Sequence, residues 1–129
     1  MSATSSADIP QFEINSGPGP EDVYVVRVAG EVDMSHEEEL RHELRTAVAA
    51  DSKGIVVDLT ECEFIDSTGI ALIVRAWQRL DRNAEGDGKG RVVIASQNDQ
   101  VRRVLEITGL ELSIPIHSTR EEALAALRT

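Results

Sequence analysis

Apolar and polar residues alternate along this chain with two different periods, and the period changes several times. Phe12 and Ile14 alternate with polar neighbours, and a second apolar run, rich in valine, occupies residues 23–29. Between the two runs, the segment Gly17-Pro18-Gly19-Pro20 interrupts the pattern. A period of two predicts strands, and the turn residues between them predict a hairpin at the start of a sheet.

After Ser35 the period lengthens to that of a helix. One face of this helix would carry the apolar residues Leu40, Leu44, Ala47 and Val48. The glutamates at 37–39 would occupy its first turn, where the helix dipole favours negative charge. Ser35 and Glu38 have the spacing of a capping box. The pattern therefore predicts a helix that begins at Ser35 and buries one apolar stripe.

Two more strands and a second helix follow. The run 55–59 predicts a strand buried on both faces, and a short acidic connection leads from it to the next helix. That helix would end near Gly86, and its buried face would carry Ile70, Ile73, Val74 and Trp77. The glycine-rich segment 86–90 predicts a turn, and residues 92–95 predict a short buried strand.

The last part of the chain repeats the alternation with shorter elements. A helix around Val101, Val104 and Leu105 would stop at Gly109. Residues 112–116 alternate as a strand whose proline suits a sheet edge, and Ser118 or Thr119 would cap a final helix. The order β-β-α-β-α-β-α-β-α indicates an α/β fold, a mixed sheet of about four or five strands covered by about four helices.

Length and composition point to one intracellular domain. The chain has 129 residues, 41% of them hydrophobic, which suffices for one core. We expect a flexible N-terminal tail at 1–9, where residues are mostly small and polar, and a single domain at 10–129. There is no run of about 18 apolar residues and no secretory signal pattern. We therefore expect a cytoplasmic protein that does not enter a membrane.

The charge balance argues against direct nucleic-acid binding. The formal net charge is -10, from 23 acidic and 13 basic residues, and it repels a phosphate backbone. The same acidity suits a partner with a basic docking surface, but it also serves solubility. Cys62 is the single cysteine, so no internal disulfide can form, and its acidic neighbours would raise the pKa of the thiol.

No enzymatic machinery can be assembled from the sequence. The segment 86–90 follows a predicted helix, whereas a phosphate loop follows a strand. His36, His42 and His117 lack the spacing of a helical metal site. Ser67 has neither a Gly-x-Ser-x-Gly context nor an assignable base. We expect no catalysis, no metal and no cofactor.

The segment Asp66-Ser67-Thr68-Gly69 begins the second predicted helix and allows two interpretations. Aspartate and serine are preferred helix caps, so the segment could be only a helix start. It could instead be a functional site, because two hydroxyls and a carboxylate meet at the positive end of a helix dipole. Composition alone leaves both open.

Short motifs along the chain decide between these interpretations. Residues 64–70, Phe-Ile-Asp-Ser-Thr-Gly-Ile, follow Val-Asp-Leu at 57–59. Gly-Glu-Val-Asp stands at 30–33, just before the first helix, and Thr-Gly-Leu stands at 108–110. In order and spacing these motifs resemble the STAS domains of the anti-sigma factor antagonist family, over about residues 10–128. The resemblance implies the STAS fold and a regulatory protein without enzymatic activity.

The resemblance also implies partners and site residues. Members of the family bind an anti-sigma factor of the histidine-kinase-like ATPase type, a serine kinase, and so release a sigma factor. Carried to this chain, the kinase would phosphorylate Ser67, with Thr68 as the second candidate, and a serine phosphatase would reset the switch. Asp33, Asp66, Thr68 and Gly69 would contact the partner, and glycine would allow close backbone approach. The resemblance further implies a monomer in isolation.

Three questions stay open. Leu72 and Ala76 widen the apolar face of the second helix, so this flank either contacts the partner or is simply buried. The chain could also be an accessory or scaffold STAS subunit of a transport or stress-signalling complex, although its free-standing length and its Asp-Ser motif favour the antagonist. A small anion or nucleotide at the helix start is a third possibility, without a supporting fingerprint.

Overall fold

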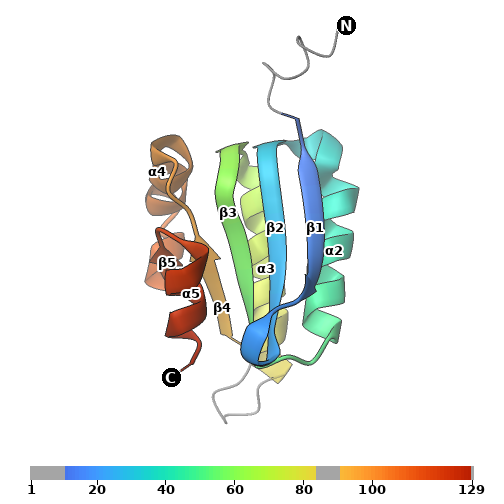
Figure 1. The fold of residues 1–129 in the computed structure, drawn as a ribbon. Coiled ribbons are helices and arrows are strands. Elements are labelled where there is room, and N and C mark those ends of the chain that lie inside the picture. Colours follow the sequence, from blue (N-terminus) through green and yellow to red (C-terminus); the bar gives the residue numbers. More distant parts are fainter. Residues whose placement is uncertain (1–10, 84–90, 129) are drawn as a thin grey trace, which may run out of the picture.

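The computed structural model describes residues 11–83 and 91–128, and in this part of the chain a five-stranded sheet is covered by four α-helices (Figure 1). The strands lie in sequence order: β1 Glu13–Pro18, β2 Val23–Val32, β3 Gly54–Ile65, β4 Arg91–Ala95 and β5 Ile116–His117. The helices are α2 Glu37–Ala49, α3 Ser67–Asn83, α4 Asp99–Ile107 and α5 Arg120–Ala126. The predicted fold class and element order are confirmed. The predicted tail at 1–9 and the turn at 86–90 lie outside the described residues.

The predicted N-terminal hairpin is confirmed as the antiparallel part of the sheet. β1 pairs with β2 from Glu13 opposite Ala29 to Pro18 opposite Tyr24, and the remaining strand pairs are parallel. Glu21 and Asp22 in the connection have φ angles of 56° and 63°, a left-handed conformation that lets the chain reverse. A mixed sheet with helical crossovers follows.

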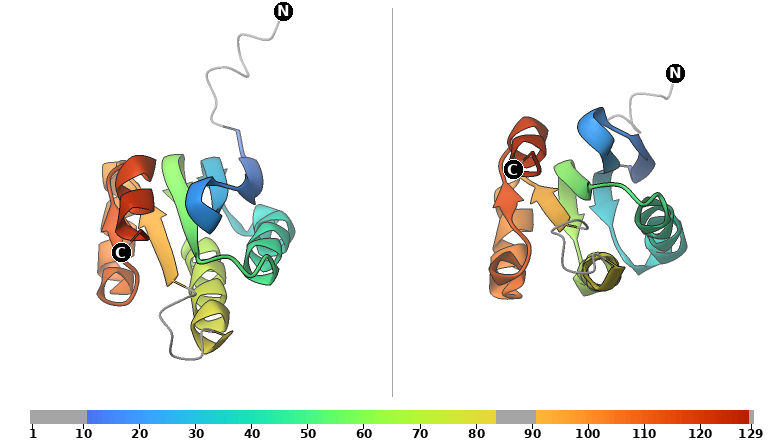
Figure 2. Two further views of the ribbon diagram at one scale, coloured as in Figure 1. Left: turned by 60° about the horizontal axis from the view of Figure 1, so that its bottom comes forward. Right: turned by 90° about the horizontal axis from the view of Figure 1, so that it is seen from below.

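The two faces of the sheet carry cores of unequal size. α2, α3 and α4 pack on one face, where the larger core includes Ile55 and Val57 of β3. α5 packs on the other face, where a smaller core includes Val56. Figure 2 shows α5 on the opposite side of the sheet from the other helices. β3 is therefore buried on both faces over its first half, as predicted.

A buried ion pair joins α5 to the smaller core. Asp58 on β3 is 4% exposed, and its Oδ2 accepts a hydrogen bond from Nε of Arg120 at 2.7 Å. The backbone N–H and the hydroxyl of Thr60 donate to Asp58 Oδ1 at 2.9 and 2.7 Å. Burial alone would raise the pKa of the Asp58 carboxyl, but these hydrogen bonds outweigh it and lower the pKa. The Asp58 side chain is thus charged and paired.

The acidic connection predicted after residue 59 is wrong, because β3 continues to Ile65. Its pairing with β2 shifts register twice, and such bulges change which side chains face the core. Cys62 and Ile65 are buried while Glu61 and Glu63 are exposed. Because buried and exposed positions do not alternate regularly here, a search for alternating apolar residues does not detect this part of the strand. Burial, more than the nearby Glu63, raises the pKa of the Cys62 thiol to about 11.

Helix ends confirm some predicted caps and correct another. Ser35 does not cap the first helix: Asp33 caps a 3-10 turn, Met34–His36, and α2 begins at Glu37. An aspartate two residues earlier thus takes over the predicted role of the serine. Gly109 follows α4 with a left-handed φ of 76°, as expected of a helix terminator. Of the two candidate caps before α5, Thr119 accepts the Glu122 N–H at 3.1 Å.

The strand predicted over 112–116 is mostly wrong, although its place at the sheet edge is confirmed. Residues 110–112 form a 3-10 turn, and only Ile116–His117 pair with β4. Leu112 is 87% exposed while Ile114 is fully buried. The alternation thus arises from a turn followed by an extended segment. The Pro115 carbonyl accepts the Ile94 N–H at 2.9 Å. Proline acts here as the acceptor, so its missing N–H group does not weaken the pairing.

Candidate functional site

The carboxyl ends of β2 and β3 bring together the two motifs that carry aspartates. The strands run parallel, with Val32 opposite Ile65, and the Asp66 N–H donates to the Val32 carbonyl at 3.2 Å. Each strand then leads directly into a helical turn. Asp33 and Asp66, far apart in sequence, therefore lie side by side at the carboxyl ends of β2 and β3. We call this end of the sheet, with Asp33, Asp66, Ser67 and Thr68, the edge.

Asp33 stabilises the turn between β2 and α2. Its carboxylate accepts the backbone N–H of Ser35 at 2.9 Å and the Ser35 hydroxyl at 2.5 Å. Both hydrogen bonds lower the pKa of the Asp33 carboxyl, and the one from the Ser35 hydroxyl has the larger effect. His36 lies with Nδ1 3.5 Å from the same carboxylate and stacks on Phe12. Asp33 is thus a fixed negative charge with a half-exposed side chain.

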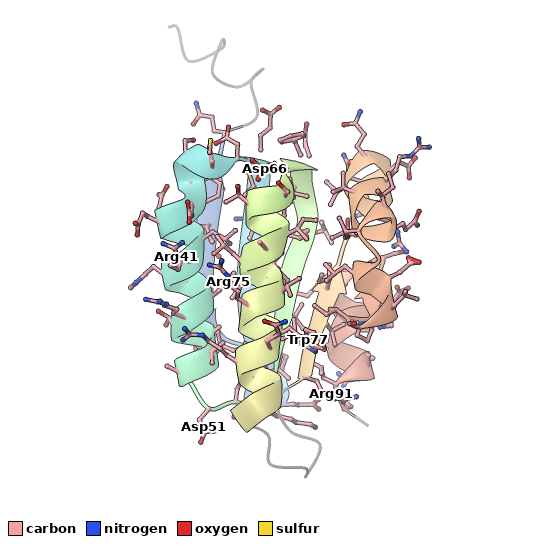
Figure 3. All side chains as sticks on the ribbon, turned by 180° about the vertical axis from the view of Figure 1, so that it is seen from behind. Arg41, Asp51, Asp66, Arg75, Trp77 and Arg91 are labelled. Carbon is pink, nitrogen blue, oxygen red and sulfur yellow. The ribbon has the colours of Figure 1, made fainter. Side chains whose placement is uncertain are left out.

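Asp66 begins α3 and places Ser67 at its first position. The Asp66 carbonyl accepts the Ile70 N–H at 3.1 Å, and its carboxylate accepts the Gly69 N–H at 3.2 Å. Figure 3 shows Asp66 at the start of the helix. Ser67 is exposed, Thr68 is half-buried, and neither hydroxyl has a hydrogen-bond partner among the described residues. The predicted cap and the accessible hydroxyl are therefore both present.

Gly69 serves packing inside the protein, and its predicted contact with a partner stays a prediction. It is buried, and a Cβ there would lie 2.8 Å from Cγ1 of Ile65 and 3.2 Å from Cγ1 of Val32. Such a contact is closer than van der Waals packing allows. Glycine thus lets the first turn of α3 approach the ends of β2 and β3.

Leu72 is also buried, which removes the basis for predicting it as a docking residue. Its side chain is 5% exposed and Ala76 is 6% exposed, both in the larger core. They lie where α3 packs beside α2, so the wide apolar stripe of α3 is explained by two neighbours, the sheet and a helix. Asp33, Asp66, Ser67 and Thr68 remain together at the edge.

The sequence analysis did not predict two large apolar side chains at this edge as contact residues. Met34, next to Asp33, is 70% exposed, and Phe64, two residues before Asp66, is 45% exposed. Exposed methionine and aromatic residues are enriched at protein interfaces. Their apolar character was visible in the sequence, but a helix or strand pattern assigns such residues to a core. Only their exposed fractions in the folded protein show that they lie on the surface.

A groove extends from the edge toward α4. Phe64 and Ile65 form one side, and residues from Asp99 to Val104 form the other, around an open volume of about 980 Å³. Asn98 caps α4 by accepting the N–H groups of Gln100 and Val101. Ser67 and Asp66 do not line this groove, which adjoins them along the chain through Phe64 and Ile65.

Charged, polar and apolar groups lie together on this surface. In the described residues, no three His, Cys, Asp or Glu side chains are placed to hold a metal ion. Over the same ranges, no helix is long and apolar enough to cross a bilayer. Negative side chains at 31, 33, 61, 63 and 66 surround the strand ends, and Arg27 pairs with Glu61. The edge offers a hydroxyl, carboxylates and two apolar side chains.

Comparisons with known proteins agree with this geometry. A model of the STAS domain family matches residues 17–123. BtrV of Bordetella bronchiseptica, described as an anti-sigma factor antagonist, is 30% identical over 78% of this chain and 82% of its own length. The anti-sigma-B factor antagonist of Staphylococcus aureus is 32% identical over 68% and 77%. An anti-sigma factor antagonist from Mycobacterium paratuberculosis superposes with a TM-score of 0.78, at 27% identity, over 95% of this chain and 97% of that one.

Proposed function

Because this chain belongs to the STAS domain family and is an anti-sigma factor antagonist, we propose that phosphorylation of Ser67 switches its binding to an anti-sigma factor on and off. Antagonists of this family are non-enzymatic regulators. The partner would therefore be the enzyme, a serine kinase of the histidine-kinase-like ATPase type. Binding in the cytoplasm would release a sigma factor, and a serine phosphatase would restore the unmodified antagonist.

The observation that carries this proposal is the placement of Ser67. Its side chain is exposed at the first position of α3, and no hydrogen bond occupies the hydroxyl among the described residues. Asp66 fixes the helix start, and Asp33 fixes the neighbouring turn. A kinase needs its acceptor hydroxyl in a defined position, and the hydrogen bonds of Asp33 and Asp66 support such a position for Ser67.

A phosphate on Ser67 would change binding more than folding. It adds about -1.5 to -2 charges and would meet the N-terminal end of α3, where the helix dipole stabilises anions. Asp66 already accepts the Gly69 N–H, so the added oxygens would point to the N–H groups of Ser67 and Thr68 or to solvent. The protein therefore tolerates the modification, while a docked partner would meet a new dianion beside two carboxylates.

The partner-facing surface extends beyond the phosphorylation site. Met34 and Phe64 flank it and supply apolar contact area, while Asp33 and Asp66 supply charge. A complementary partner would bring basic groups to the carboxylates and apolar groups to the two side chains. Because a phosphate in the middle of such a contact lacks a prepared pocket, an affinity loss of about a hundredfold, ~2.7 kcal/mol, is expected.

Burial favours Ser67 over Thr68 as the acceptor. Thr68 is half-buried, and its methyl group restricts rotation of the side chain. Ser67 is exposed and unbranched. A kinase active site would reach Ser67 without moving the first turn of α3.

The test is to purify the protein with its partners from its native cytoplasm and to map modified residues by mass spectrometry. We expect an ATPase of the kinase type in the complex, phosphate on Ser67, and loss of that phosphate in Ser67→Ala. Thr68→Ala is the matched control and should still carry phosphate on Ser67. Phosphate on Thr68 would move the site by one residue. Transporter or scaffold partners with unmodified Ser67 would favour the accessory-subunit alternative.

A further inference from the structure

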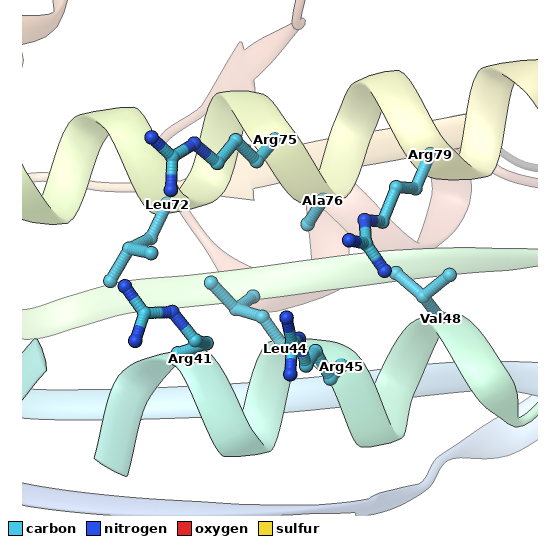
Figure 4. Close-up of a pocket in the computed structure, with 8 residues that line it drawn as sticks. All are labelled: Arg41, Leu44, Arg45, Val48, Leu72, Arg75, Ala76 and Arg79. Atoms are coloured by element: carbon cyan, nitrogen blue, oxygen red, sulfur yellow. The ribbon is translucent and has the colours of Figure 1, made fainter. Parts of the chain in front are cut away.

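A second surface, away from the edge, lies between α2 and α3 and is lined by eight residues. Its floor is apolar: Leu44, Leu72 and Ala76 lie buried beneath it, and Val48 is half-buried. Its rim carries Arg41 and Arg45 from α2 and Arg75 and Arg79 from α3 (Figure 4). The open volume is about 410 Å³. We call this surface the arginine groove.

The arginines are arranged in two pairs of like charge. Arg41 and Arg45 are four residues apart on α2, and Arg75 and Arg79 are four residues apart on α3. Residues at this spacing are neighbours on a helix surface, where like charges destabilise the helix. In Figure 4 the guanidinium groups of both pairs lie over the groove. Four positive charges therefore face one another across a narrow space.

Among the residues that the structure describes, most of this charge is not neutralised. Arg41 contacts Glu37 and, at 3.8 Å, Glu38. Arg45, Arg75 and Arg79 form no ion pair with any residue that the structure describes. The chain has 23 acidic and 13 basic residues, so an acidic partner would be expected for most arginines. Three arginines at one site without such a partner in the described part of the chain are the opposite of that expectation. The arginine groove is a concentrated positive site on an acidic protein.

We propose that the arginine groove binds an acidic helical segment of a partner protein. Every lining side chain is either apolar or a pure hydrogen-bond donor, so the ligand must offer acceptors and an apolar group. Glutamates one helical turn apart would match the arginine pairs and form bidentate contacts, and an apolar side chain between them would contact the half-buried Val48 and the arginine stems. The net charge of -10 opposes the continuous row of phosphates of a nucleic acid more than it opposes a short segment with two glutamates, and two arginine pairs on two helices suit an extended ligand better than a compact phosphate.

This inference does not depend on the phosphorylation of Ser67. Ser67 does not line the groove, and the lining residues of α3 begin one turn or more further along the helix. The two surfaces could contact the same partner or different partners. A Ser67→Asp variant should therefore bind an acidic segment as the wild type does, so failure of one proposal leaves the other standing.

The experiment titrates the full chain, labelled with ¹⁵N, with a synthetic peptide of about 14 residues, four helical turns, that places glutamates at i and i+4 and leucines between them. We expect chemical-shift changes along α2 and α3. Arg45→Glu and Arg75→Glu should each weaken binding about tenfold, since a charge-assisted contact becomes a repulsion. Arg128→Glu is the matched control: it makes the same charge change at an exposed site, where Arg128 pairs with Glu21. It should change the affinity less than about twofold.

Several results would overturn the proposal. One is equal weakening by Arg128→Glu and Arg75→Glu, which would show only general electrostatic attraction. Another is binding of inorganic pyrophosphate with the same shifts and at least the same affinity, which would indicate a small-anion site. A third is the absence of shifts in α2 and α3, which would mean that the arginines only cover the apolar floor with their stems. Unchanged thermal unfolding of each variant confirms that it is folded.

Discussion

Aspartates organise both the smaller core and the candidate site, but in opposite surroundings. Asp58 is 4% exposed and is fully engaged by Thr60 and Arg120 beneath α5. Asp33 and Asp66 accept comparable local hydrogen bonds, yet they stand at an open edge beside an exposed serine. The difference teaches that burial, and not hydrogen bonding, separates a structural aspartate from one available to a partner. Changes at Asp58 should affect folding, and changes at the edge should affect binding.

The largest expected effect is on stability, from Asp58→Ala. It removes a carboxylate that joins β3 to α5 and leaves the Arg120 guanidinium without its partner. Because Arg120 is 40% exposed and can be hydrated, we expect a loss of about 3 kcal/mol, at the lower end for a broken buried pair. Urea unfolding measures it. Arg120→Ala should cost a similar amount, and a loss below about 1 kcal/mol for both variants would break the comparison.

The reverse effect is expected at the edge, from Ser67→Asp. A carboxylate at this exposed position imitates part of the charge of a phosphate, so affinity for the anti-sigma factor should fall by about a hundredfold while urea unfolding changes by less than about 0.5 kcal/mol. Isothermal titration calorimetry with the purified partner measures the first quantity. Ser67→Ala is the control and should bind as the wild type does. Equal affinities for both variants would contradict a switch at Ser67.

A smaller effect on stability is expected from Gly69→Ala in the first turn of α3, beside the ends of β2 and β3. Alanine favours a helix, but its Cβ would press against Ile65 and Val32, so overpacking should cost about 1–2 kcal/mol. Thermal unfolding measures the loss. The exposed neighbour Ala71 on α3 supplies a control, because Ala71→Gly should lose about 1 kcal/mol through helix propensity alone. A stabilised Gly69→Ala would show that the edge can relax and admit a partner there.

The sequence predicts the order of the elements well, because the valine-rich strands and the helix stripes have distinct periods. It fails along residues 60–65, where two shifts in pairing mix buried and exposed positions, and at residues 112–116, where a turn imitates alternation. The motifs identify Asp33, Asp66 and Ser67, but their meeting at one edge depends on strand register. The buried state of Leu72 and the arginine groove depend on how α2 lies beside α3, which no local pattern encodes.

The smallest expected effect is on the pH dependence of stability, which should differ between the buried Asp58 and the exposed Asp33. The pKa of Asp58 is lower in the folded protein than its ordinary value, so its contribution to stability is complete above that ordinary value and is lost as the pH falls through the lower, folded pKa. Asp58→Asn should therefore flatten the fall of the unfolding temperature as the pH drops below the ordinary value of about 4. The pKa of Asp33 is also lowered, but its surroundings are open to solvent, so Asp33→Asn should leave this pH dependence nearly unchanged. If both substitutions flatten the curve equally, local hydrogen bonds matter more than burial, and the distinction between the two kinds of aspartate fails.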